Sequence, residues 1–479
     1  MTQLMWTHRS IGHDTPARRE VLALFKLSWP VCTCSLLTFS FQFINMLGAG
    51  RLGKDTLAAV ALANSYFNIV SYFVIGAATS IDTLVSQAYG RSDIVECQQW
   101  LIRSLIVFSA ASLPLCGLLA SAGPIFRFCN FREDMVEPAV TYLMRLLPGT
   151  PFFIWFTCLQ KYQQSMNLMA PALGTLIVCS VVNVGATAWA VSVGQLTGLA
   201  WILTMARILL FAVMVVAFFR SSPEWRRVDA ESLKWKLWSR GPLSTFLKLS
   251  SSGAFMTGLE AMAFEITVLA AGALGTTAID AHNILLQIIA FIYLSVPLGV
   301  SIAATIRIGN LLGRGDSATA KLSAQLCIGV GTTFMLISAF GLYGLRHSLG
   351  SIFSPNEEVI ALVATVAPVA ACFQLLDGFQ GVSGGVLRAM GQQAFLAKSI
   401  FFAFWVVALP IGYWTCFSLG LGIFGLWVGL AVGLGGMALA FGCRVFLWTD
   451  WEMEASKASK RSDCMLEPLV SPLIEPTIR

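Results

Sequence analysis

The chain consists largely of long apolar segments separated by short polar connectors. Six of these segments lie before a charged stretch at 220–248, and six lie after it. They run at about 22–48, 57–86, 101–122, 138–160, 168–192, 196–219, 249–274, 279–309, 322–345, 358–387, 396–417 and 421–448. A helix needs about 20 mostly apolar residues to cross the hydrocarbon layer of a bilayer. The pattern therefore predicts an all-α polytopic membrane protein with twelve transmembrane helices.

The scarcity of charge supports the same fold class. Only 12% of the 479 residues are charged and 56% are hydrophobic, whereas soluble domains have about 25% charged residues. This composition argues against a soluble enzyme and against a nucleic-acid-binding domain. The sequence contains neither a catalytic constellation nor a His, Cys and Glu cluster with metal-ligand spacing. We therefore expect no enzyme activity, no metal site and no cofactor.

The basic residues predict the orientation of the chain in the membrane. If the N-terminus is cytoplasmic, 24 of the 31 Lys and Arg residues fall on the cytoplasmic side and only five on the opposite side. Cytoplasmic loops of membrane proteins carry an excess of Lys and Arg. Both termini are therefore predicted to be cytoplasmic.

The two halves of the chain resemble each other. Leu52-Gly53 precedes a long apolar segment that ends in the polar turn 87–93, and Leu274-Gly275 precedes another that ends in the turn 310–316. Six helices separate the two copies, so both halves have the same orientation. Parallel repeats of this kind are related by a pseudo-two-fold axis along the membrane normal in several transporters. The path of a transported molecule would then run between the two lobes.

These observations divide the chain into five parts. We expect a cytoplasmic N-terminal segment at 1–20, a first lobe of six helices at 21–219 and a second lobe of six helices at 249–448. A cytoplasmic linker at 220–248 joins the lobes, and a cytoplasmic tail occupies 449–479.

Three acidic residues inside the apolar segments are the main candidates for function. Glu260, Glu265 and Asp377 have no basic residue within a helical turn, and ionisable residues in the hydrocarbon layer are costly and mark functional sites by default. A carboxyl group removed from water favours its neutral form, so it can exchange a proton and, when charged, attract a cation. The alternative is a protonated carboxyl that only joins helices. Four other ionisable residues in these segments are interpreted as structural: Asp82, Arg145, Arg207 and Arg388.

Polar residues in the second and eighth segments are predicted to line a cavity, which for the second segment is that of the first lobe. Asn64 and Asn68 lie on one face of the second segment, where they could instead join helices. Gln287 and Tyr293 lie in the eighth segment.

Several motifs, taken in their order along residues 20–450, resemble the multidrug and toxic compound extrusion (MATE) family, and its eukaryotic branch in particular. They are Ser28-Trp-Pro30, Leu52-Gly53 with Leu57-Ala-Ala59, Ile81–Gly90, Leu259-Glu260 with Phe264-Glu265, Val296-Pro297-Leu-Gly299 with Arg307–Gly313, and Ser383–Gly391.

The resemblance implies a V of two six-helix lobes and an exchange of organic cations or other xenobiotics against protons. The carboxylates that matter in eukaryotic members fall on Glu260, Glu265 and Asp377, and an asparagine of the first lobe falls on Asn68. Animal members usually carry a further glutamate in the eighth segment, where Gln287 is the nearest residue here. This departure leaves the coupling stoichiometry and the cation preference open.

The leading hypothesis is a monomeric, proton-coupled efflux antiporter of the plasma membrane, with small organic cations or xenobiotics and the lipid bilayer as its partners. Coupling to Na⁺ instead of H⁺ is an alternative. A flippase of a lipid-linked precursor on the same fold is another, although its anionic cargo would require basic rather than acidic residues in the cavity. A membrane receptor without transport would give no reason for three isolated acids.

Overall fold

The computed structural model describes residues 15–129, 131–194, 196–222, 225 and 240–463. The first half of the chain folds into helices joined by short connections. Their bounds are α1 (Pro16–Leu52), α2 (Lys54–Gly90), α3 (Ile94–Ala120), α4 (Ala122–Phe128), α5 (Glu133–Leu146), η1 (Leu147–Gly149), α6 (Thr150–Ser165), α7 (Ala170–Val193) and α8 (Leu196–Ser221).

The second half is also helical, and η3 and η4 wind as π-helix. Its elements are α10 (Arg240–Gly272), α11 (Thr276–Ser295), α12 (Pro297–Gly313), α13 (Ser317–Gly344), α14 (Arg346–Phe353), α15 (Glu357–Ala389), α16 (Gln393–Ile400), η3 (Phe401–Ala408), α17 (Leu409–Tyr413), η4 (Trp414–Ser418), α18 (Gly422–Phe446) and α19 (Trp451–Asp463).

The predicted polytopic all-α architecture is confirmed. Within the described ranges, eleven helical stretches are long and apolar enough to cross a membrane. The remaining predicted segment, 138–160, falls on α5, η1 and α6, where Pro148 and Pro151 interrupt a single continuous helix. Proline lacks a backbone N–H and cannot continue the ladder of hydrogen bonds. This segment is therefore a bent span rather than one straight helix.

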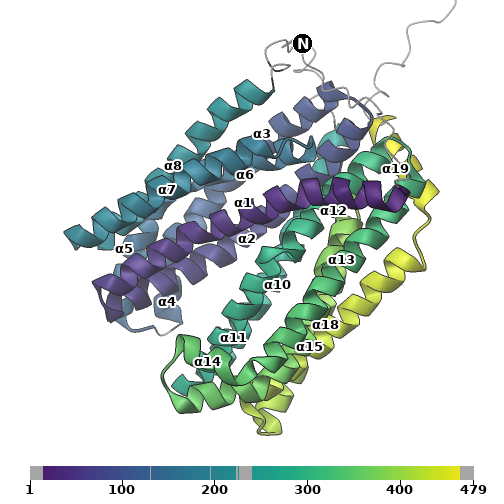
Figure 1. Cartoon of the computed structure of the whole chain (residues 1–479). Helices are drawn as coiled ribbons and strands as arrows, with labels where there is room; N and C mark the ends of the chain where they lie inside the picture. The colour runs from purple at the N-terminus through teal and green to yellow at the C-terminus, as the bar shows by residue number, and fades with distance from the viewer. Residues whose placement is uncertain (1–14, 130, 195, 223–224, 226–239, 464–479) are drawn as a thin grey trace, which may run out of the picture.

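The helices form two groups with separate hydrophobic cores. One core draws its residues from Cys34 to Phe246, and the other contains Leu24 and residues from Met256 to Ala458. Figure 1 shows the two groups meeting at the end that carries α12 and α19 and spreading apart toward the end that carries α14. The arrangement is a V of two lobes.

Contacts at the closed end of the V come from four long helices. α2 packs closely on α10 and α12, and α1 crosses α12. Gly76 of α2 and Gly253 of α10 face each other so closely that a Cβ on either one would overlap the carbonyl oxygen of the other. Glu20 of α1 pairs with Arg307 of α12, with 2.7 Å between Oε1 and Nε.

The internal repeat in the sequence is matched by the same backbone conformation at equivalent turns of the two halves. Gly53 directly precedes α2 with φ 131° and Gly275 directly precedes α11 with φ 113°, a conformation that residues with a Cβ rarely adopt. Asp93 caps α3 by accepting from the Glu96 N–H, and Asp316 caps α13 by accepting from the Thr319 N–H. Equivalent turns in the two halves are thus built in the same way.

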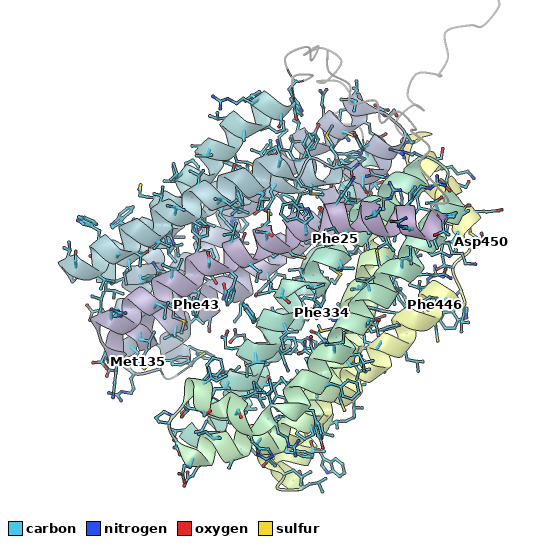
Figure 2. All side chains as sticks on the ribbon, in the orientation of Figure 1. Phe25, Phe43, Met135, Phe334, Phe446 and Asp450 are labelled. Carbon is cyan, nitrogen blue, oxygen red and sulfur yellow. The ribbon has the colours of Figure 1, made fainter. Side chains whose placement is uncertain are left out.

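Large apolar side chains project from the helix surfaces of both lobes. Phe43 on α1 and Phe446 on α18 are 52% and 50% exposed (Figure 2). Exposed aromatic and aliphatic side chains of this kind are expected where a helix faces lipid rather than water.

The structure bears on the predicted division into five parts at three places. α1 begins at Pro16 rather than in the region of residue 21, and α10 begins at Arg240, inside the predicted linker 220–248. The tail contains the helix α19, which hydropathy alone did not indicate. Residues 1–14, the linker residues 223–224 and 226–239, and the tail residues 464–479 lie outside the described part of the chain.

Candidate functional site

Glu260 and Glu265 both lie on α10, in the middle of a membrane-spanning helix. Both side chains are half-buried. Their spacing of five residues separates them by about 140° around the helix axis. The two carboxylates therefore face different neighbours.

Asp377 lies on α15 and faces the same region as Glu260. It is buried, and Gln380, one turn further along the helix, donates a hydrogen bond to its carboxylate, with 3.1 Å between Nε2 and Oδ1. Glu260 interacts electrostatically with Asp377, and Gln380 also lies within reach of the Glu260 carboxylate. Two of the three predicted acids are thus brought together, from helices that are more than 100 residues apart in sequence.

A tyrosine and an arginine complete this group. Tyr293, at the end of α11, interacts electrostatically with Asp377, Glu260 and Arg388. It lies against α15 at Gly381, where a Cβ would be only 2.6 Å from the tyrosine hydroxyl oxygen. Arg388 donates a hydrogen bond to the Ser301 hydroxyl at 2.8 Å. The Glu260, Asp377, Gln380, Tyr293 and Arg388 side chains are called the acid cluster below.

The position of Tyr293 follows from a break in the eighth predicted segment. α11 ends at Ser295 and α12 begins at Pro297, while Val296 between them has φ −130° and ψ −52°. Proline at the first turn of a helix costs no hydrogen bond, whereas in the interior it removes one and kinks or breaks the helix. The break interrupts the helix next to Tyr293. The Val296 carbonyl oxygen accepts from the Val300 N–H at 2.9 Å and from the Cys32 thiol of α1 at 3.7 Å.

Glu265 is not part of the acid cluster, and its neighbour comes from the other lobe. Tyr72 of α2 interacts electrostatically with both Glu265 and Glu260. Its side chain is 40% exposed although it lies deep within a membrane-spanning helix. Tyr72 was not among the residues predicted from the sequence. Tyr72 lies four residues after Asn68, which itself lies four residues after Asn64. This spacing is the signal that could have identified it, because residues four apart share a helix face.

The predicted polar residues of the first lobe lie further along the same face of α2. Asn68 accepts a hydrogen bond from Gln42 of α1 at 3.0 Å. Asn64 is buried, and its Oδ1 atom has no hydrogen-bond partner in the described residues. Asn64, Asn68 and Tyr72 together form a polar stripe that leads toward Glu260 and Glu265.

Gln287 is exposed on α11. It is six residues before Tyr293, so it lies nearly two turns away from the acid cluster along the same helix. None of the interactions that join the acid cluster involves it.

The structure also contains a buried ion pair in the first lobe. Lys161 of α6 forms an ion pair with Asp82 of α2, with 2.6 Å between Nζ and Oδ2. Both side chains are nearly inaccessible to solvent. Asp82 was interpreted as structural, and the apolar segment predicted at 138–160 ended just before Lys161. α6 continues to Ser165 and buries the lysine instead. Asp82 also interacts electrostatically with Arg388 of the second lobe.

Two further features lie away from the acid cluster. An apolar groove of about 560 Å³ is lined by residues of α3, α6 and α8, including Trp155 and Phe218, and by none of the predicted site residues. Arg207, which was interpreted as structural, stacks over the Phe67 ring with 4.1 Å to the ring centroid. Across the described residues, no three His, Cys, Asp or Glu side chains are grouped to hold a metal ion.

Comparison with known proteins gives consistent results for sequence and structure. The family model MatE matches residues 30–189 and 254–414. Multidrug and toxin extrusion protein 2 of Mus musculus is 30% identical over 93% of this chain and 77% of its own length. Multidrug and toxin extrusion protein 2 of Oryctolagus cuniculus is 31% identical over 92% of this chain and 73% of its own length.

Solved structures match over nearly the whole chain. The eukaryotic MATE transporter AtDTX14 superimposes with a TM-score of 0.84 at 21% identity, covering 93% of this chain and all of that one. The Vibrio cholerae MATE transporter VcmN in its bent form superimposes with a TM-score of 0.76 at 17% identity, covering 94% of this chain and all of that one.

Proposed function

The chain belongs to the MATE family of multidrug and toxin extrusion transporters, and from this premise we propose that it is a proton-coupled antiporter that exports organic cations. It is a multi-pass membrane protein and a transporter rather than an enzyme. The coupling ion, the class of substrate and the residues that bind both are inferred from the acid cluster and its neighbours.

The observation that carries the proposal is the grouping of Glu260 and Asp377 within one membrane-embedded site. Two carboxylates at close range repel each other when both are charged. A proton or a bound cation relieves this repulsion. Arg388 interacts with Glu260 as well, so it offsets part of the negative charge without a proton. The same group can therefore accept either an H⁺ or an organic cation, as exchange requires.

The position of Tyr72 favours an aromatic or amphipathic cation as substrate. A cation over the face of an aromatic ring is stabilised by about 0.5–2 kcal/mol, depending on its exposure to water. Tyr72 presents a partly exposed ring from the first lobe, and Glu260 and Glu265 approach it from the second. A flat cation between them would contact both lobes at once.

In the proposed cycle, protons and substrate compete for the acids. A cytosolic cation binds the charged carboxylates while the site faces the cytoplasm. After the lobes reorient, protons from the more acidic side neutralise the carboxylates and release the cation. One pH unit across the membrane supplies about 1.36 kcal/mol per proton. A one-to-one exchange could then maintain roughly a tenfold gradient of substrate per pH unit.

The cellular setting is part of the proposal. We assign the protein to the plasma membrane as a monomer, with both termini in the cytoplasm. The distribution of Lys and Arg supports this orientation. The closed end of the V, which carries α19, then faces the cytoplasm, and the lobes spread apart toward the outside.

Flux measurements in proteoliposomes test the proposed function. The purified protein is reconstituted with a fluorescent organic cation inside the vesicles, and a proton gradient or a sodium gradient is imposed separately. We expect an inward-directed proton gradient to drive loss of the dye from the lumen and a sodium gradient of equal size to have no effect. The opposite result would replace H⁺ by Na⁺ as the coupling ion, and no flux under either gradient would contradict the proposal.

A further inference from the structure

The C-terminus of α15 is held by side chains from two other helices. Thr83 Oγ1 donates to the carbonyl oxygen of Arg388 and Gln87 Nε2 donates to that of Ala389, each at 2.7 Å. Arg461 Nη2 donates to the next carbonyl, that of Met390, at 2.8 Å. The last carbonyls of a helix lack partners within the helix. Here three in succession receive donors from α2 of the first lobe and from α19.

α19 belongs structurally to the second lobe. Trp451, Ala455 and Ala458 are buried and form part of the core of that lobe. The helix packs against α12 and α13. Figure 1 shows it at the closed end of the V. It therefore moves with the second lobe.

The other side of α19 binds the end of α2 in the first lobe. Arg461 Nη1 donates to Gln87 Oε1 at 2.9 Å, and Arg91 Nη1 donates to the carbonyl oxygen of Ala458 at 2.6 Å. Glu96 fixes the Arg91 guanidinium through an ion pair of 2.6 Å. Arg461 thus touches both lobes, through Gln87 on one and the Met390 carbonyl on the other.

The helix that these contacts hold also carries part of the acid cluster. Asp377, Gln380 and Arg388 all lie on α15. Opening the V at this end would separate α2 from α15 and break the bonds of Thr83, Gln87 and Arg461. α19 lies beyond the residues that the MatE family model matches, 30–189 and 254–414.

We propose that α19 is a latch that keeps the two lobes joined at the closed end of the V, with Arg461 as its positioning residue. This inference rests on the alternation between two orientations in the proposed function, but it does not depend on the substrate or the coupling ion. The described partners of Arg461, Gln87 and the Met390 carbonyl, lie outside the acid cluster. It acts by setting how much free energy is required to part α2 from α15.

The two orientations of the lobes are in equilibrium, and the distance between the open ends of the lobes reports which orientation is populated. Spin labels at Arg132 of the first lobe and Ser351 of the second, both exposed, report on that distance in the full-length protein in lipid nanodiscs. The exposed Cys129 and Cys372 are replaced by serine beforehand. When the closed end of the V opens, the labelled ends should approach each other and give a shorter distance.

Arg461→Gln and Lys460→Gln form a matched pair, because both remove one positive charge from neighbouring positions on α19. Lys460 is exposed, so its replacement should leave the distance distribution unchanged. Arg461→Gln removes a hydrogen bond from a charged group to each lobe, and we expect the population with the shorter distance to rise about tenfold. Arg461→Lys keeps the charge and some of the hydrogen-bond donors. Its population with the shorter distance should be intermediate between those of Arg461→Gln and the unmodified protein.

An unchanged distribution in Arg461→Gln would overturn the latch, and so would equal shifts in Arg461→Gln and Lys460→Gln. If Arg461→Gln does not fold, Arg91→Gln decides the question, since it removes the first-lobe donor to the Ala458 carbonyl of α19 and leaves the Gln87 bond to Ala389 in place. A shift to the shorter distance in Arg91→Gln supports the latch, and no shift overturns it. The experiment measures a distance and not transport. A failure of the proposed exchange reaction would therefore produce neither the shift that supports the latch nor the unchanged distance that overturns it.

Discussion

Gln380 donates a hydrogen bond to the carboxylate of Asp377 from one turn further along α15, with 3.1 Å between Nε2 and Oδ1. This contact favours the charged form of the carboxylate, which is the form that binds a cation. The amide therefore influences the balance between proton and substrate at the site without carrying a charge itself.

Replacement of Gln380 should shift the pH dependence of substrate binding. In Gln380→Leu the charged form of Asp377 loses its donor, so a higher pH is needed to reach the same cation affinity. We expect the midpoint of binding against pH to rise by about one to two units, since a hydrogen bond to a charged group contributes about 1.5–3 kcal/mol and one pH unit corresponds to about 1.36 kcal/mol. Titration of a fluorescent cation at a series of pH values measures this midpoint.

Gln287→Leu is the control for this shift. Gln287 is exposed on α11 and takes no part in the interactions of the acid cluster, so the midpoint should stay where it is in the unmodified protein. Equal midpoints for Gln380→Leu and Gln287→Leu would show that the amide of Gln380 does not influence the acids.

Tyr72 should contribute to affinity through its ring rather than its hydroxyl group. Tyr72→Phe keeps the ring and should bind an aromatic cation about as tightly as the unmodified protein. Tyr72→Leu removes a cation–π contact of about 0.5–2 kcal/mol, so the Kd should rise roughly twofold to thirtyfold. Tyr343→Leu is the matched control, because Tyr343 stacks with Arg346 near the end of α13, away from the site. An unchanged Kd in Tyr72→Leu would remove Tyr72 from the proposed site.

The ion pair of Asp82 and Lys161 should stabilise the fold rather than bind substrate. Removing one partner of a buried pair leaves the other charge uncompensated and costs about 3–5 kcal/mol. Lys161→Met and Asp82→Asn should therefore each lower the Tm markedly, while the double variant should recover much of the loss. Thermal unfolding in lipid nanodiscs gives the Tm of the two single variants and of the double variant. Additive losses in the double variant would contradict a direct pair.

The fold could be predicted from the sequence because lipid imposes one simple requirement. Every backbone polar group in the bilayer needs a partner within the chain, so each long apolar segment becomes a helix. The bent fourth span follows from Pro148 and Pro151. α19 was not predicted because it is polar and short, and its position depends on tertiary contacts such as that of Arg461 with Gln87.

The acids of the candidate site could be identified because a carboxyl group in an apolar segment is rare. Which of them lie together could not be predicted, since that depends on how α10 and α15 pack. Tyr72 and Gln380 carry no charge and do not stand out in such segments. Lys161 follows a polar residue near the end of its segment, and a lysine there is typical of the membrane interface. Only the packing of α6 on α2 shows that it is buried.

The competition between proton and substrate is tested most directly by measuring the protons released when the substrate binds. The purified protein in weakly buffered solution near neutral pH receives an organic cation, and a pH-sensitive dye reports the protons that appear. We predict release of protons in proportion to bound cation and a large loss of that release in Glu260→Gln, Glu265→Gln and Asp377→Asn. Tight binding of the cation without any proton release in the unmodified protein would contradict this competition, on which the proposed exchange depends.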